Sequence, residues 1–317
     1  MIGRSSDRMS RRSLVRASAA LGAGTLALGA SRGPAFAQPA SPAATPDVSL
    51  SYARPDLLAA PGTIPEDHSL VALMSAATYA AGHIAVSSQI DWSTLNLADT
   101  SDAAIADWDG SVRAALAPIG ALSAPVLAYD EGTLFAARLW WVLFYLGYPT
   151  AAVLNGGLPA WVAAGKPVVT GDTGLPAPLV ATPAPESVPA VRRDALATLT
   201  DVEGILGNKN VVILDARAPS EYEAGHIPGA VNLEYTKNAA SMSPPLWKPA
   251  SELMEMYAAI GVTPDKKIVP YCSTGVRSAV TFFTLWLLGF PQVGLYTGSW
   301  QEWGANPKTP KTKGAEP

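Results

Sequence analysis

The sequence predicts an α/β protein made of two copies of one domain, each a mainly parallel sheet flanked by helices. Short runs rich in β-branched residues, at 211–214 and 267–269, are bounded by charged or turn residues, as buried parallel strands are. Helical candidates lie between and after these runs, at 251–259 and 277–288. Strands that alternate with helices of this length form βαβ units, in which helices cover both faces of the sheet.

The two copies are visible as an internal repeat. Three anchors recur in the same order at an offset of 142 or 143 residues: residues 79–84 as 222–227, residues 146–149 as 288–291, and Gly156 with Trp161 as Gly298 with Trp303. Anchors at a nearly constant offset indicate a duplicated domain. The length of 317 residues suits this organisation, since one domain takes about 100 to 200 residues.

Composition excludes several classes of protein. With 49% hydrophobic and 15% charged residues, the chain is not mostly disordered. Its single cysteine excludes an intramolecular disulfide, and one cysteine with three scattered histidines leaves no metal-ligand cluster of the usual spacings. Since the sequence contains no phosphate loop or dinucleotide fingerprint either, we expect neither a metal nor an organic cofactor.

Residues 1–37 have the pattern of an export signal. The pair Arg11-Arg12 precedes a weakly apolar run at 17–30 and a small-residue site that ends at Ala37. Adjacent arginines indicate the twin-arginine route, so we expect the twin-arginine export machinery as a partner, cleavage after Ala37 and a periplasmic or secreted protein. The run is too short and too rich in glycine and alanine for a membrane span, which takes about 20 strongly apolar residues.

Cleavage would change the charge of the chain. It removes six arginines and one aspartate, which leaves 16 basic and 25 acidic residues and a net charge of −9. Such a surface repels phosphate backbones and anionic lipid, so we expect no nucleic-acid binding. An anionic substrate must then be held by a local positive field.

Proline content divides the rest of the chain. Residues 170–190 carry five prolines amid small residues. Because proline removes backbone donors and favours extended conformations, this stretch predicts a semi-rigid linker. We therefore expect an N-terminal domain over 38–169, a C-terminal domain over 191–303 and an extended tail over 304–317.

The candidate chemistry centres on Cys272, where the strand at 267–269 runs into a short loop that opens a helix. The loop consists of Ser273, Thr274, Gly275, Val276, Arg277 and Ser278. Ligands bind at the carboxyl edge of open parallel sheets, and the amides of such a loop and helix N-terminus can point at the sulfur. Gly275 permits a φ that a side chain would forbid, and Arg277 adds positive charge, so we expect a nucleophilic thiolate. An isolated free cysteine is more often inert, but an inert cysteine needs no donor-rich turn.

Four motifs follow one another in a fixed order around this loop. They are Leu-Asp-Ala-Arg at 214–217 with Glu221-Tyr222, Gly-His-Ile-Pro-Gly-Ala at 225–230, Cys-Ser-Thr-Gly-Val-Arg-Ser at 272–278 and Thr-Gly-Ser-Trp at 297–300. In this order they closely resemble the motifs of the rhodanese sulfurtransferases. The resemblance is strong over 198–303 and weaker over 63–161, and it implies two tandem rhodanese-like domains, as in thiosulfate and 3-mercaptopyruvate sulfurtransferases.

The resemblance implies that Cys272 takes sulfane sulfur from a small anionic donor, forms a persulfide and passes the outer sulfur to a thiophilic acceptor such as cyanide or a thiol. The residues suit this chemistry, since loop amides stabilise charge on the outer sulfur and a thiolate leaves readily. Neutral Ser273 and Thr274 are similar to the loop of mercaptopyruvate enzymes, while Arg277 restores one positive charge, as in thiosulfate enzymes. We favour thiosulfate, because a dianion needs that charge more.

Two other functions remain open from the sequence. A thiolate among amides also attacks phosphate, but protein tyrosine phosphatases resemble His-Cys followed by five residues and Arg. Here Tyr271 precedes Cys272, and four residues separate the cysteine from Arg277. The other alternative is a persulfide sulfur-carrier or partner-binding module with little small-molecule turnover.

Three residues outside the loop are candidates for supporting it. We expect Asp215 to tie the strand end to the Gly-His-Ile-Pro-Gly turn, with Arg217 as its partner. Glu221 is expected to pair with Arg277 and hold the loop. In animal thiosulfate sulfurtransferases, a second arginine that helps to bind the donor falls near the position of Glu221. This chain departs from that pattern, because it has an acidic residue there.

The first copy lacks these groups. Aligned on the nearest anchors, Asp215, Arg217, Glu221, Cys272 and Arg277 correspond to Ala72, Met74, Thr78, Asp130 and Phe135. We therefore expect the N-terminal domain to be catalytically inactive and to serve as scaffold and one wall of the cleft, as in similar tandem rhodaneses. Because this copy keeps His83 as the counterpart of His226, both histidines are expected to be structural. Core or interface packing is expected of Trp140, Trp141, Trp286, Trp300 and Trp303.

Overall fold

The computed structural model describes residues 52–123, 125–148, 151–171 and 188–317. The predicted export signal and most of the predicted proline-rich linker lie outside the described residues. Within the described part, none of the helices is long and apolar enough to span a bilayer.

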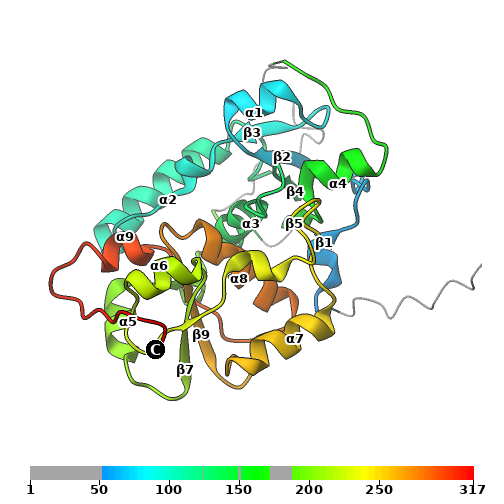
Figure 1. Cartoon of the computed structure of the whole chain (residues 1–317). Helices are drawn as coiled ribbons and strands as arrows, with labels where there is room; N and C mark the ends of the chain where they lie inside the picture. Colours follow the sequence, from blue (N-terminus) through cyan, green and yellow to red (C-terminus); the bar gives the residue numbers. More distant parts are fainter. Residues whose placement is uncertain (1–51, 124, 149–150, 172–187) are drawn as a thin grey trace, which may run out of the picture. The chain divides into compact units, whose positions relative to one another are not determined.

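The first repeat contains a five-stranded parallel sheet with the strand order β1-β5-β4-β2-β3 (Figure 1). Its elements in chain order are η1 (Pro55–Leu57), β1 (Leu58–Ala59), β2 (Ser69–Leu73), α1 (Ala76–Ala81), β3 (Ser88–Ile90), η2 (Trp92–Leu95), α2 (Asp102–Leu116), β4 (Val126–Tyr129), α3 (Ala136–Tyr145), β5 (Ala151–Leu154) and α4 (Gly157–Ala163). Parallel neighbours need crossover connections, which the helices between the strands supply.

The second repeat follows the same strand order in two pieces. Strands β8-β7-β9 form one parallel sheet and β10-β6 another, and an isolated parallel bridge joins Ile268 to Val293 beside them. Its elements are η3 (Arg193–Ala195), β6 (Leu196–Ala197), α5 (Leu199–Ile205), β7 (Val211–Asp215), α6 (Pro219–Ala224), β8 (Val231–Asn232), η4 (Tyr235–Asn238), α7 (Ala250–Ala259), β9 (Lys267–Tyr271), α8 (Val276–Leu287), β10 (Leu295–Tyr296) and α9 (Ser299–Trp303).

The predicted elements are present, with small differences at their ends. The expected strands are β7 and β9, each one or two residues longer because pairing continues to Asp215 and Tyr271. The expected helices are α7 and α8, each with one end or both ends displaced by one residue. The predicted α/β class with parallel sheets is confirmed.

Strand register shows how the two repeats correspond. Ala72 on β2 lies beside Tyr129 on β4, and Asp215 on β7 lies beside Tyr271 on β9. Both tyrosine hydroxyls accept a hydrogen bond at 3.1 Å from the backbone N–H of the isoleucine in the Gly-His-Ile turn. The residue after each tyrosine is therefore equivalent, and Cys272 stands where the first repeat has Asp130.

Helices α3 and α8 pack against each other and join the two repeats. Every residue of α3 is buried, as expected of a helix in which Arg138 is the one charged residue among apolar and aromatic ones. The ring of Trp140 lies 6.2 Å from that of Phe282 and 4.9 Å from that of Phe283, in the edge and tilted arrangements that aromatic pairs favour. This contact places the loop before α3 and the loop before α8 in one region of the fold.

Each repeat closes on itself through the segment after its last helix. The indole of Trp161 donates to the carbonyl of Pro167, and that of Trp303 donates to the carbonyl of Pro310, both at 2.8 Å. Shortly after each proline the chain forms an antiparallel bridge with the Gly-His-Ile turn, His83 with Val169 and His226 with Thr312. The segment 304–317 is largely exposed, but it is held at these points.

Candidate active site

Cys272 lies at the carboxyl end of β9, one short loop before α8. Its side chain is fully buried, and the backbone N–H of Gly275 donates to Sγ at 3.2 Å. Gly275 has φ 84°, and a Cβ there would lie 2.8 Å from the carbonyl oxygen of Thr297, so the turn requires glycine. Of the several amides expected around the sulfur, this is the one that donates to it among the described residues.

Backbone hydrogen bonds fix both sides of the cysteine. The hydroxyl of Ser299 accepts from the N–H of Cys272 at 3.1 Å, and the carbonyl of Cys272 accepts from the N–H of Trp300 at 2.9 Å. Both partners belong to the Thr-Gly-Ser-Trp motif at 297–300, whose last two residues form the start of α9 (Ser299–Trp303). Cys272 is thus held in place by a second motif that lies more than 20 residues further along the chain.

Arg277 and Glu221 form the ion pair expected from the sequence. The guanidinium of Arg277 donates to both carboxylate oxygens of Glu221, at 2.7 and 2.8 Å, and to the hydroxyl of Ser273 at 2.6 Å. These hydrogen bonds lower the pKa of Glu221 to about 2 and raise the pKa of Arg277. The loop is therefore tied to helix α6 by a bidentate, charge-assisted contact.

Asp215 and Arg217 support the Gly-His-Ile turn, and neither takes part in the hydrogen bond between Gly275 and the sulfur of Cys272. Both are buried, and the guanidinium donates to the Asp215 carboxylate at 2.6 Å and to the carbonyl of Gly225 at 2.7 Å. The plane of Arg217 also lies over the ring of Trp300, 4.6 Å from its centre. The pair therefore joins the end of β7 to the Gly-His-Ile turn.

The remaining loop residues differ in exposure. Thr274 is half-buried, and Val276 is buried at the start of α8. Ser278 is fully buried, and its hydroxyl makes no hydrogen bond with any described residue.

In the first repeat the equivalent loop is filled by its own carboxylate. Asp130 is buried and accepts from the backbone N–H groups of Gly132, Thr133 and Ala136 at 2.7 to 2.9 Å. Burial raises the pKa of Asp130, and these donors oppose that shift. The loop of this fold thus binds carboxyl oxygens through backbone amides, and here the chain itself supplies them.

The two repeats meet around this loop through aromatic rings. Phe135, at the position equivalent to Arg277, lies 6.0 Å from Tyr235 of the second repeat. Burial raises the pKa of Tyr235, and Arg277 is close enough to oppose the shift. Sequence reasoning missed Tyr235, because this tyrosine lies after the Gly-His-Ile-Pro-Gly-Ala motif at 225–230 and belongs to none of the four motifs.

Arg138 on α3 is a second residue that sequence reasoning missed. It is fully buried, and its guanidinium donates to the carbonyls of Gly275 and Leu95. Its counterpart in the second repeat, by the 142-residue offset, is Val280. The signal was present: Arg138 is the one charged residue in the helix Ala136–Tyr145.

The chain matches the family model of the rhodanese-like domain twice, over residues 56–164 and 198–306. It belongs to the rhodanese-like family. The predicted family and the tandem arrangement are confirmed. The match includes the loop around Cys272 and, in the first repeat, the loop around Asp130.

Curated relatives of this tandem rhodanese carry sulfur-transfer names. It is 35% identical to the thiosulfate sulfurtransferase of Pseudomonas aeruginosa over 252 residues, which cover 76% of this chain and 89% of that protein. It is 36% identical to the thiosulfate sulfurtransferase of Azotobacter vinelandii, with the same coverage of both chains. The sulfur carrier protein TtuD of Thermus thermophilus is 33% identical, over 75% of this chain and 88% of that protein. The predicted sulfurtransferase function agrees with the names of the first two.

Solved structures share the fold of this rhodanese at lower sequence identity. EanB in complex with ergothioneine has a TM-score of 0.69 and 22% identity, over 80% of this chain and 66% of that one. YnjE has a TM-score of 0.66 and 23% identity, over 78% of this chain and 63% of that one. At these identities the likeness concerns the architecture.

The two equivalent histidines of the rhodanese repeats have the same local surroundings. In each, Nδ1 lies 2.9 Å from a tyrosine carbonyl four residues earlier, Tyr79 for His83 and Tyr222 for His226. Since a carbonyl can only accept, Nδ1 carries the proton. Each imidazole stacks on that tyrosine ring at 3.7 Å. The shared geometry supports a structural role for both.

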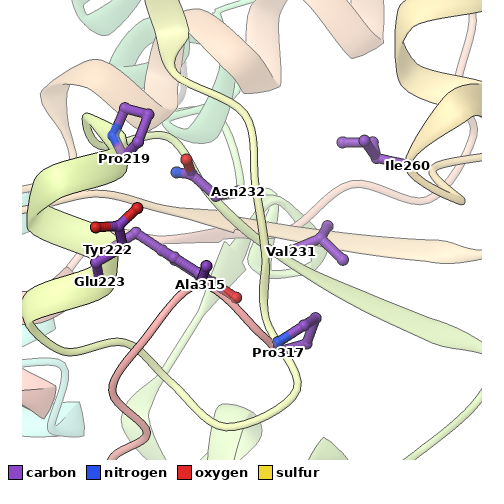
Figure 2. Close-up of a pocket in the computed structure, with 8 residues that line it drawn as sticks. All are labelled: Pro219, Tyr222, Glu223, Val231, Asn232, Ile260, Ala315 and Pro317. Carbon is purple, nitrogen blue, oxygen red and sulfur yellow. The ribbon is translucent and has the colours of Figure 1, made fainter.

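A pocket on the second repeat lies beside helix α6 and strand β8. Figure 2 shows it between helix α6, strand β8 and the C-terminal residues, with Tyr222, Glu223 and Asn232 among the side chains that line it. None of the predicted site residues lines this pocket. Across the described ranges, no group of three or more His, Cys, Asp or Glu side chains could hold a metal ion.

Asp130 allows a test of the first repeat. In Asp130→Ala we expect kcat to stay nearly unchanged, because the repeat carries no nucleophile. Stability should fall by on the order of 1 to 3 kcal/mol, since buried N–H groups lose their acceptor. Calorimetry and a steady-state assay measure the two effects, with Asp130→Asn as a control that keeps one acceptor oxygen. A loss of kcat above about a hundredfold, or roughly 2.7 kcal/mol, would contradict the expectation that the first repeat supplies no catalytic group.

Proposed function

We propose that this rhodanese is a thiosulfate sulfurtransferase that works through a persulfide on Cys272. The observation that carries the proposal is the placement of the cysteine sulfur. It accepts the Gly275 N–H at the carboxyl edge of the sheet, in a loop that Arg277 and Glu221 hold. Names of curated relatives at 35% and 36% identity support it.

The reaction needs two displacements at sulfur. The Cys272 thiolate attacks the outer sulfur of thiosulfate, a sulfur–sulfur bond forms, the bond within the donor breaks and sulfite leaves with the electron pair. An acceptor such as cyanide then attacks the outer sulfur of the persulfide, thiocyanate forms and the Cys272 thiolate leaves. The Gly275 N–H stabilises negative charge on the cysteine sulfur at the start and the end of this cycle.

The donor is tested by comparing kcat/KM for thiosulfate and 3-mercaptopyruvate with cyanide as acceptor. We expect the value for thiosulfate to be the higher of the two, in line with the names of the relatives at 35% and 36% identity. A higher value for 3-mercaptopyruvate would reassign the donor and keep the sulfurtransferase activity. The alternative, a persulfide carrier with little turnover, is not favoured, since the relatives at 35% and 36% identity carry the names of sulfurtransferases and the carrier name belongs to TtuD at 33%. A stable persulfide without turnover on either donor would favour that alternative.

We also propose that residues 1–37 are a twin-arginine export signal, cleaved after Ala37, and that the mature protein is periplasmic or secreted. The paired arginines and the small-residue site that ends at Ala37 support this. N-terminal sequencing of protein from the periplasm or medium should begin at Gln38. Arg11→Lys combined with Arg12→Lys should retain the protein in the cytoplasm, and export of that variant would contradict the proposal.

A further inference from the structure

Arg138 is a buried cation without an acidic partner. Its side chain is fully buried on α3, and no carboxylate of the described residues lies within ion-pair distance of it. Its Nε is also buried without a hydrogen-bond acceptor. A charge in such surroundings is costly unless something compensates for it. A negative charge close to Arg138 would offset this cost.

The contacts of Arg138 lead to the nucleophile. Nη1 donates to the carbonyl of Gly275 at 3.5 Å, Nη2 donates to the carbonyl of Leu95 at 2.6 Å, and the guanidinium lies over Trp141. Gly275 is the residue whose N–H donates to Cys272 Sγ. The guanidinium from the first repeat therefore fixes the same residue that contacts the sulfur in the second repeat.

The charges around the sulfur leave Arg138 as the unbalanced cation. Arg277 on α8 also faces Cys272, but both oxygens of Glu221 on α6 already bind its guanidinium. Tyr235 on η4 faces the sulfur as a neutral phenol, because burial raises its pKa. The pair of Arg277 and Glu221 has no net charge. The positive charge of Arg138 therefore remains to balance the negative charge of the Cys272 thiolate.

Electrostatics agrees with this geometry. Burial lowers the pKa of Arg138 to about 9, and a Cys272 thiolate is the charged group that raises it. The guanidinium therefore stays protonated at neutral pH and interacts favourably with the ionised sulfur.

We propose that Arg138 is a positioning residue of the sulfur-transfer site, supplied by the first repeat. Its cation stabilises negative charge on the Cys272 sulfur, and its contact with the Gly275 carbonyl holds the N–H that the sulfur accepts. This role rests on the proposed function, because it assumes that Cys272 transfers sulfur. The effect of Arg138 on the Cys272 thiolate is measurable without sulfur transfer. The first repeat would then have lost the nucleophile and kept an essential charge for the other copy.

The experiment is alkylation of Cys272 by iodoacetamide, a neutral reagent, followed as a function of pH in the full chain. In Arg138→Met we expect the midpoint of the rate profile to move up by about one pH unit or more, which is about a tenfold loss of rate at neutral pH. Arg113→Met is the matched control. Like Arg138, Arg113 belongs to the first repeat, donates to backbone carbonyls and lies over an aromatic ring, which is that of Tyr148. An Arg138→Met profile that coincides with that of Arg113→Met would overturn the proposal.

Two more variants distinguish the effect of the charge of Arg138 from that of its packing. They also replace Arg138→Met in the experiment if that variant does not fold. Arg138→Lys keeps the charge and should leave the midpoint near that of the wild type. Arg138→Gln keeps a hydrogen-bond donor without the charge and should move the midpoint upward. Equal midpoints in these two variants would show that charge is not the cause and would reject the proposal. Wild-type protein that turns over neither donor would reject the proposed function while leaving this comparison intact.

Discussion

Replacing Cys272 with serine is expected to abolish sulfur transfer and leave the fold intact. A serine hydroxyl is far harder to ionise than a thiol and cannot become a persulfide. The chain contains one cysteine, so no other residue can take over the sulfur. Serine can still accept the Gly275 N–H, which should keep the loop closed.

Mass spectrometry after treatment with thiosulfate measures this directly. The wild type should gain one sulfur atom and lose it again on addition of cyanide, while Cys272→Ser should gain none. Near-ultraviolet circular dichroism of the two proteins should coincide. Turnover that persists in Cys272→Ser would refute the persulfide mechanism.

Arg277→Ala is expected to reduce kcat/KM for thiosulfate by about a hundredfold or more, or roughly 2.7 kcal/mol. The structure favours a loop-holding role for the larger part of this effect. The guanidinium binds both oxygens of Glu221 and the hydroxyl of Ser273, so its removal leaves the hydrogen bond from Ser273 to Glu221, at 3.1 Å, as the remaining side-chain tie between the described loop residues and α6. It also leaves an unpaired carboxylate close to the path of an anionic donor.

Two kinetic patterns distinguish the roles of Arg277. If it holds the loop, Arg277→Ala should slow alkylation of Cys272 by neutral reagents, and Glu221→Gln should show a similar defect. If it binds the donor directly, KM for thiosulfate should rise and depend less on salt, while alkylation stays as in the wild type. Thiosulfate kinetics unchanged in Arg277→Ala would show that the backbone of the loop suffices.

The ion pair also sets an expectation for acid pH. Since the pKa of Glu221 is lower in the fold than in the unfolded chain, the pair stabilises the protein above pH about 4.3 and loses this effect as pH falls toward about 2. A loss of activity at milder acidity must come from another group. The pH dependence of thermal unfolding in the wild type and in Glu221→Gln should differ least at the lowest pH.

Much of the fold was predictable because it depends on local pattern and on duplication. β-rich runs gave the strands β7 and β9, and the repeated anchors gave the equivalence of Asp130 and Cys272. The pairing of Glu221 with Arg277 was also predictable, since both residues lie in family motifs and are absent together from the first copy. In each case the information lies within one repeat or in the comparison of the two copies along the sequence.

Contacts that cross between the repeats were not predictable in the same way. Arg138 and Gly275 are 137 positions apart, and nothing in the pattern of either segment names the other. Phe135 and Tyr235 also meet only because α3 and α8 pack together. The lone arginine in an apolar helix was a visible anomaly, but its partner depended on tertiary packing.

The closing segments after Trp161 and Trp303 define how long one ancestral module has to be. The family match ends at residues 164 and 306, yet the bridges of His83 and His226 are made by Val169 and Thr312. A single repeat cut at the family boundary would leave the backbone of a fully buried histidine without its hydrogen-bond partners. The gene segment that was duplicated must therefore have encoded this closing segment too, and a recombinant half-molecule should extend past it.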